Sequence, residues 1–111
     1  MTVTQRSSLP IGPKPLFRGG STLIPRLGLD VMVDKNTGLL RTDRGVSVFD
    51  EAARVERFGG AYQVASMPIG LTIQQRGRDL SHYEILPTEP MTFERYATLL
   101  QQVVLRPISK E

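Results

Sequence analysis

Three short segments of this 111-residue chain carry side chains that could bind a ligand or take part in a reaction. The first places Arg18 after a short apolar stretch and directly before Gly19 and Gly20. A guanidinium there could reach into a cleft and bind a phosphate through two hydrogen bonds, while the glycines let a ligand approach the backbone. Taken alone, the segment favours the plainer interpretation of an exposed arginine beside a turn.

The second segment, residues 45–50, places Ser47 between two valines. Successive side chains of a strand point to opposite faces, so the valines would face the core and the Ser47 hydroxyl would point the other way. That hydroxyl could hold a sugar or an amide. Taken alone, a half-exposed serine of an ordinary strand is the safer interpretation. The chain has one histidine, which leaves little from which to build a nucleophilic triad.

The third segment, residues 81–87, contains that histidine, His82. On a strand, His82 and Glu84 would point to one face, and Tyr83 and Ile85 to the other. A histidine and a carboxylate on one face can bind hydroxyl groups and stabilise a developing positive charge. Such neighbouring pairs are also common on protein surfaces, where most have no catalytic role.

Composition narrows the chemistry. The chain has no cysteine, which excludes disulfides, thiolate nucleophiles, zinc–thiolate sites and iron–sulfur clusters. Among its basic residues only Lys14, Lys35 and Lys110 are lysines, and all the others are arginines. An excess of arginine fits binding of a phosphorylated ligand or of nucleic acid, and it equally fits a compositional bias of the genome. Composition does not decide between these interpretations.

The chain shows no targeting or membrane-spanning pattern. No apolar run approaches the ~20 residues needed to cross a bilayer. The polar N-terminus lacks the apolar core of a secretory signal. We therefore expect a protein that is cytoplasmic in the cell that makes it, and that needs a dedicated machine if it is secreted into other cells.

Many short strands and one clear helix are expected to position these residues. Alternation and turn residues predict strands at 16–18, 29–34, 39–41, 45–49, 61–65, 71–75 and 83–86. Apolar residues at helical spacing from Phe93 to Val104, after Thr92 as N-cap, predict the best-defined helix. Asp50 as N-cap and the glycines at 59–60 predict a short helix over 51–58.

The chain length fits one domain, with an α+β class and a mainly antiparallel sheet. Prolines at positions 10, 13 and 15 predict an irregular N-terminal arm over residues 1–15. The folded domain is then expected over residues 16–106.

In their order and spacing, these segments resemble the ADP-ribosyltransferase-like cytotoxic toxins that bacteria deliver by type VI secretion. The resemblance is carried by Leu16-Phe17-Arg18, by Gly45-Val46-Ser47-Val48-Phe49-Asp50, and by His82-Tyr83-Glu84-Ile85-Leu86-Pro87 followed by Pro90-Met91 and a helix. It spans roughly Leu16 to Val104, and the run from His82 to Met91 is its most specific part. It implies a split, mainly antiparallel sheet of the diphtheria-toxin and exotoxin type, with one or two helices and a cleft for NAD.

The resemblance also implies a role for each motif. Arg18 would hold the phosphates of NAD, and Ser47 would position the nicotinamide ribose. His82 occupies the place where the family keeps a cleft histidine, and we expect it to act in catalysis.

The expected reaction requires an acid and an aromatic ring. Breaking the nicotinamide–ribose bond builds an oxocarbenium-like ribose that a nearby carboxylate stabilises. Glu84 is the first candidate for that carboxylate and Glu89 the second. Tyr62 and Phe49 are the candidates for a ring that stacks on nicotinamide.

We therefore expect a toxin that acts as an NAD-dependent ADP-ribosyltransferase on an intracellular acceptor macromolecule, with NAD as its substrate and no metal or membrane. The same site would serve an NAD glycohydrolase. Transfer of an RNA phosphate to NAD ranks lower, because such an enzyme should carry more basic residues near the cleft. A non-catalytic binding module with a degenerate transferase fold is the alternative from another class. The resemblance further implies an immunity protein as partner.

Overall fold

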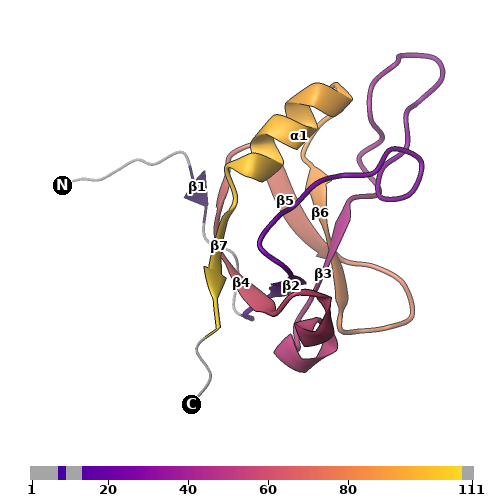
Figure 1. Cartoon of the computed structure of the whole chain (residues 1–111). Coiled ribbons are helices and arrows are strands. Elements are labelled where there is room, and N and C mark those ends of the chain that lie inside the picture. The colour runs from indigo at the N-terminus through magenta and orange to yellow at the C-terminus, as the bar shows by residue number, and fades with distance from the viewer. Residues whose placement is uncertain (1–7, 10–13, 109–111) are drawn as a thin grey trace.

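The computed structural model of the protein describes residues 8–9 and 14–108 (Figure 1). Its elements are β1 (Ser8–Leu9), β2 (Phe17–Gly19), β3 (Val46–Phe49), two 3₁₀ turns (Ala52–Arg54 and Glu56–Phe58), β4 (Ala61–Pro68), β5 (Leu71–Gln75), β6 (His82–Pro87), α1 (Phe93–Gln101) and β7 (Val104–Pro107). The strands form one curled antiparallel sheet in the order β1-β4-β2-β3-β6-β5, and β7 also pairs with β4. This arrangement confirms the predicted α+β class with a mainly antiparallel sheet.

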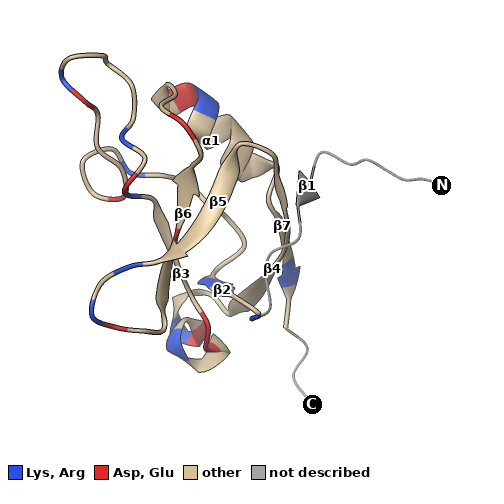
Figure 2. Ribbon diagram, turned by 180° about the vertical axis from the view of Figure 1, so that it is seen from behind, with Lys and Arg blue, Asp and Glu red and all other residues tan. Residues whose placement is uncertain are grey.

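The core lies between the sheet and α1. In Figure 1, α1 lies over one end of the sheet, next to β5 and β6. The helix buries Tyr96, Leu99 and Leu100 against apolar side chains of the strands. Those strand side chains include Val46, Val48, Val64, Leu71 and Ile85, all of which are fully buried. Figure 2 shows that charged residues lie mainly in the loops, the 3₁₀ turns and the outer side of α1.

The phenol of Tyr96 ties α1 to two adjacent strands. Its hydroxyl accepts a hydrogen bond from the backbone N of Val46 in β3 at 3.1 Å and donates one to the carbonyl oxygen of Ile85 in β6 at 2.5 Å. The residue before Val46 is Gly45, where a Cβ atom would lie 1.8 Å from the Ile85 oxygen. Only glycine allows this close approach, so the sequence and the tyrosine together fix how β3 lies beside β6.

Several predicted elements are confirmed with small differences at their ends. β3, β4, β5 and β6 correspond to the strands predicted at 45–49, 61–65, 71–75 and 83–86, and β2 to the strand at 16–18. The N-cap of the helix is confirmed, because Thr92 Oγ1 accepts a hydrogen bond from the backbone N of Arg95 at 3.1 Å. Of the predicted arm over 1–15, the described residues include β1, which pairs with Pro68 and Met67 of β4.

The helix predicted over 51–58 is wrong, because this segment forms two separate 3₁₀ turns. Neither turn contains a buried residue, and Val55, which lies between them, is the buried apolar side chain of the segment. A short helix is stabilised mainly by an apolar stripe packed on the core. With one such side chain, this segment lacks that stripe.

The strands predicted at 29–34 and 39–41 are also wrong, because this region is a loop with isolated bridges from Leu27 to Val31 and from Val33 to Leu40. Asp34 explains part of this outcome, since its side chain accepts a hydrogen bond from the backbone N of Asn36 at 2.7 Å. Such local bonding offers the backbone an alternative to a strand ladder.

The predicted helix extends too far. α1 ends at Gln101, and Val104 begins β7, an unpredicted strand that pairs with β4. Valine favours the pleated surface of a sheet, and here the free edge of β4 lies within reach. The apolar spacing alone does not distinguish this strand from another helical turn.

We predict that Tyr96→Phe lowers the free energy of unfolding by about 1–3 kcal/mol, because it removes the partner of two buried backbone groups. Urea denaturation measures this change. Tyr83→Phe is the matched control, since the Tyr83 hydroxyl contacts the exposed amine of Lys14 at 3.4 Å and should matter little. Equal losses in both variants would contradict the structural role of the Tyr96 hydroxyl.

The same tyrosine predicts a dependence of stability on pH. Burial raises the pKa of the Tyr96 phenol, so the unfolded chain releases this proton before the folded chain does. Its contribution to stability is therefore complete below about pH 10, the ordinary range of tyrosine, and declines as the pH rises further. Denaturation at several alkaline pH values should show a steeper decline for the native protein than for Tyr96→Phe. Parallel declines would contradict this assignment.

Candidate functional site

The pairing of β3 with β6 gathers polar and aromatic side chains on the outer face of the sheet. Ser47 lies opposite Glu84, and Phe49 lies opposite His82. Ser47 and Phe49 are half-buried, whereas the valines that alternate with them in β3 are buried, as the strand alternation predicts. The described structure thus places the second and third sequence motifs beside each other.

A chain of hydrogen bonds runs through His82. Its Nε2 lies 2.8 Å from the hydroxyl oxygen of Ser47, and its Nδ1 lies 2.9 Å from the carbonyl oxygen of Arg76. A carbonyl oxygen can only accept, so Nδ1 carries the proton that is donated to Arg76. In the neutral ring, Nε2 is then the acceptor and the Ser47 hydroxyl is the donor.

Glu84 is held beside this chain, and its side chain is 13% exposed. Its Oε1 accepts a hydrogen bond from the backbone N of Gly45 at 3.0 Å and lies 3.6 Å from Nε of Arg76. Its other oxygen, Oε2, lies 3.7 Å from Nε2 of His82. These contacts fix a carboxylate next to the imidazole. We call Ser47, Arg76, His82 and Glu84 the polar cluster.

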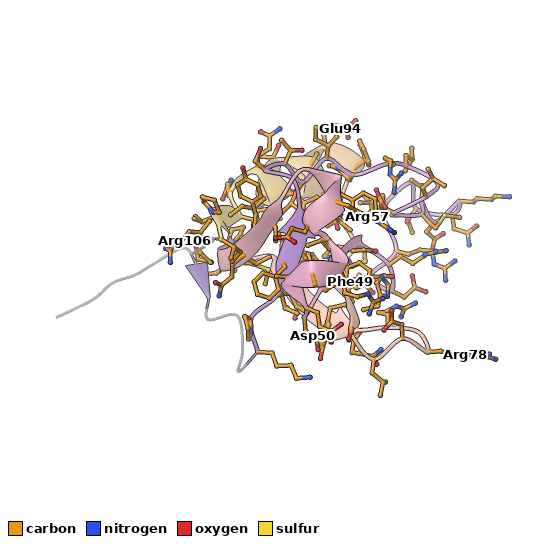
Figure 3. The ribbon with its side chains drawn as sticks, turned by 60° about the horizontal axis from the view of Figure 1, so that its bottom comes forward. Phe49, Asp50, Arg57, Arg78, Glu94 and Arg106 are labelled. Atoms are coloured by element: carbon orange, nitrogen blue, oxygen red, sulfur yellow. The ribbon has the colours of Figure 1, made fainter. Side chains whose placement is uncertain are left out.

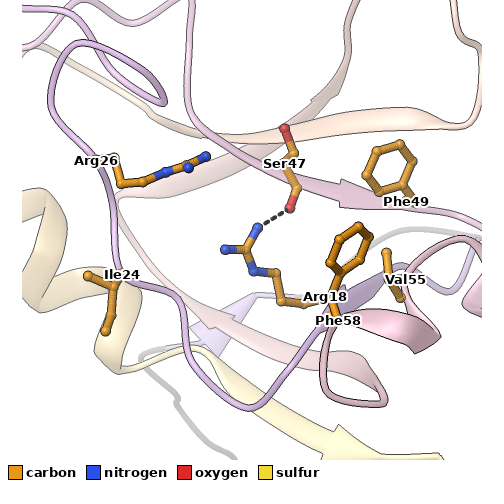
Figure 4. Close-up of a pocket in the computed structure, with 8 residues that line it drawn as sticks. Arg18, Ile24, Arg26, Ser47, Phe49, Val55 and Phe58 are labelled. Carbon is orange, nitrogen blue, oxygen red and sulfur yellow. Dashed lines mark hydrogen bonds between the residues drawn. The ribbon is translucent and has the colours of Figure 1, made fainter.

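A pocket of about 450 Å³ lies next to the polar cluster (Figure 4). Its lining residues are Arg18, Gly19, Ile24, Arg26, Ser47, Phe49, Val55 and Phe58. Ser47 therefore belongs to both the pocket and the polar cluster. The volume and the mixture of apolar and polar walls are typical of small-molecule sites.

Arg18 enters this pocket from β2. Its Nη1 donates a hydrogen bond to the carbonyl oxygen of Ser47 at 2.9 Å, and its Nε is buried without a hydrogen-bond partner among the described residues. Burial lowers the pKa of the Arg18 guanidinium, which means that its charge is disfavoured by the surroundings. An anion in the pocket would compensate this cost.

Arg26 is the second cation of the pocket, and its charge is already compensated. Asp30 accepts hydrogen bonds from Nε and Nη2 of Arg26 at 3.0 and 3.1 Å and from its backbone N at 2.8 Å. Figure 4 shows both guanidinium groups pointing into the space between β3 and the loop that carries Ile24. In the described pocket only Arg26 is in a direct ion pair, while Asp30 also interacts electrostatically with Arg18 and raises its pKa against the larger effect of burial.

The ring of Phe49 lies near two other side chains, those of His82 and Arg54. Its centroid is 5.3 Å from that of the His82 ring and 5.0 Å from the guanidinium carbon of Arg54. Arg54 also forms an ion pair with Asp79, which joins the first 3₁₀ turn to the loop before β6. Figure 3 shows Phe49 within the body of the molecule, whereas Arg78 extends away from it at the tip of that loop.

The remaining candidates from the sequence lie elsewhere. Tyr62 is paired with Arg18 in the register of β2 and β4 but does not line the pocket. Glu89 is exposed in the turn after β6. Of the two acid candidates and the two aromatic candidates, the structure brings Glu84 and Phe49 to Ser47.

Sequence reasoning missed several residues of the site. Arg26 and Asp30 are separated by four positions around a glycine, and this spacing of opposite charges was a signal for their pairing. Phe58 had no signal, because it reaches the pocket through the unpredicted 3₁₀ turn. Arg76 contributes a backbone carbonyl, which no pattern of side chains reveals.

Comparison with known proteins adds no relative. No protein-family model, no curated protein sequence and no solved structure matches the chain. In the described part of the chain, no helix is long and apolar enough to span a membrane. The same residues include no group of three or more His, Cys, Asp or Glu side chains that could hold a metal ion.

We predict that inorganic pyrophosphate binds at Arg18 and stabilises the fold. At about ten times its dissociation constant, a ligand of the folded state adds about 1.4 kcal/mol, which corresponds to a rise of several degrees in Tm. Thermal denaturation at constant ionic strength should show this rise in the native protein and in Arg78→Met, but not in Arg18→Met. A rise of the same size in Arg18→Met would mean that the anion binds elsewhere.

Proposed function

We propose that this protein is an NAD-dependent ADP-ribosyltransferase of the type VI toxin kind, and that its curled sheet is the split sheet of that fold. The observation that carries the proposal is the double role of Ser47. Its carbonyl oxygen accepts a hydrogen bond from Arg18, and its hydroxyl is hydrogen-bonded to His82. One residue therefore links the guanidinium of Arg18 to a histidine–carboxylate pair.

Different residues of the site would bind different parts of NAD. Arg18 would bind the diphosphate, because the Nε of its half-buried guanidinium has no hydrogen-bond partner among the described residues. The hydroxyl of Ser47 and the imidazole of His82 would hold the nicotinamide ribose, and Phe49 offers an aromatic surface beside them.

Glu84 would then act on the reacting carbon. The bond between the ribose C1′ and nicotinamide breaks, the electron pair leaves with neutral nicotinamide, and positive charge develops on the ribose. A fixed carboxylate stabilises this charge. The acceptor then forms the new bond to C1′ and loses its proton. With water as acceptor the same step is NAD hydrolysis.

The toxin proposal has consequences for the cell. A producing cell would need an immunity protein to block the site, and the toxin would leave the cytoplasm through a dedicated secretion machine. Its acceptor would be a macromolecule inside the target cell. These partners rest on the family resemblance, whereas the NAD chemistry also has support from the pocket and the polar cluster.

The test of this function is release of nicotinamide from NAD by the purified protein, with cell lysate supplied as a source of acceptors. Glu84→Gln should lower the rate by about 100-fold, because the amide keeps an acceptor for Gly45 and loses the charge. Glu89→Gln is the matched control and should leave the rate unchanged. Arg18→Lys should raise the KM for NAD, since lysine cannot form the bidentate contact with phosphate that arginine forms.

The opposite outcomes are equally informative. Equal rates for the native protein and folded Glu84→Gln would remove Glu84 from the reaction. No release by the native protein, even with lysate, would contradict the enzyme and favour a binding module with a degenerate transferase fold.

A further inference from the structure

The polar cluster has the parts of an activated nucleophile. The hydroxyl of Ser47 in β3 is hydrogen-bonded to Nε2 of His82 in β6. Nδ1 of the same ring is hydrogen-bonded to the carbonyl oxygen of Arg76, which follows β5. The two distances are 2.8 and 2.9 Å, within the range for a nucleophile, a base and the group that orients the base. Three segments of the fold therefore contribute to one chain of hydrogen bonds that ends at the Ser47 hydroxyl.

The proton positions follow from the partners. The Arg76 carbonyl requires the proton on Nδ1, so Nε2 presents its lone pair to the Ser47 hydroxyl. When that proton moves to Nε2, the ring becomes a cation 3.7 Å from Oε2 of Glu84. The carboxylate stabilises the imidazolium from the Nε2 side, whereas serine hydrolases place their acid on Nδ1, which here bonds to the Arg76 carbonyl instead.

The surroundings of Ser47 suit a small ester. Ser47 lines the pocket together with the apolar side chains of Phe49, Val55 and Phe58, which can receive a short acyl group. Nε of Arg76 is buried and has no hydrogen-bond partner among the described residues. Because Arg76 pairs with Glu84 at 3.6 Å and does not line the pocket, the guanidinium that could donate to an oxyanion there is that of Arg18.

We propose that Ser47 is a nucleophile with His82 as its general base, and that it hydrolyses carboxylic esters with short apolar acyl groups without NAD. The Ser47 oxygen bonds to the ester carbonyl carbon while its proton passes to Nε2 of His82. The ester C–O bond then breaks, and the leaving alcohol takes that proton. Water attacks the acyl-serine, gives its proton to Nε2, and releases the carboxylic acid as the serine recovers its hydrogen. This activity is separate from the proposed transferase, although it uses the same hydroxyl.

Covalent labelling with phenylmethanesulfonyl fluoride tests the nucleophile directly. The Ser47 oxygen bonds to sulfur, fluoride leaves, and the proton passes to His82. Mass spectrometry of peptides should find the label at Ser47, and hydrolysis of p-nitrophenyl acetate should fall in proportion to labelling. Absence of the label at Ser47 in the folded native protein would overturn the proposal.

The decisive variant is His82→Gln, because glutamine can still bond to Ser47 but cannot accept its proton at neutral pH. Labelling and ester hydrolysis should fall by about 100-fold in this variant. Ser81→Ala, a change of the half-buried serine next to His82, should behave like the native protein. Unchanged labelling of Ser47 in His82→Gln would show that no base activates it and would overturn the proposal.

Nicotinamide release on the same samples separates this inference from the proposed function. Labelling of Ser47 without nicotinamide release would support the nucleophile and contradict the transferase. Nicotinamide release without labelling would overturn the nucleophile alone.

Discussion

The hydroxyl of Tyr96 joins the helix to the two strands that carry the candidate site, and the geometry of the site depends on that junction. It bonds to Val46 at 3.1 Å and to Ile85 at 2.5 Å, between strands whose pairing places Ser47 opposite Glu84. Because a one-residue shift would move every side chain of a strand to the other face, this register decides whether the polar cluster exists. The buried phenol therefore serves the site although it lies on the opposite side of the sheet.

The interior and the site differ in how completely their polar groups are satisfied. Among the described residues, no polar or charged residue is buried as a whole, and the core consists of apolar side chains with Tyr96 among them. At the site, Nε of Arg18 and Nε of Arg76 are buried without a hydrogen-bond partner in the described structure, and outside it the same holds for Oδ1 of Asp43 and Oδ1 of Asp50. Buried donors without partners cost free energy, and proteins accept such costs mainly where a ligand or a reaction later uses the donor. One such donor lies in the pocket and one in the polar cluster, and the two regions meet at Ser47.

The sequence predicted those parts of the site that depend on local patterns. Strand alternation predicted that Ser47 lies on the face of the sheet away from its neighbouring valines, and Thr92 as N-cap predicted where the helix starts. It did not predict that Tyr96 crosses to the backbone of two strands, because such a contact depends on how the helix packs. Likewise, the apolar residues at 103–104 fit the helical spacing, but in the folded chain Val104 pairs with the edge of β4. Tertiary contacts thus decided the elements and the site residues that local patterns missed.

A titration with NAD, followed by backbone amide chemical shifts, tests whether NAD binds at Arg18. Binding there should cause saturable shifts around the pocket, at Gly19, Ser47, Phe49 and Phe58, which change together along one binding curve. A second hollow of about 430 Å³, lined mainly by residues 34–43, should show no such shifts. Shifts confined to that second hollow, or no saturable shift at millimolar NAD, would mean that NAD does not bind at Arg18.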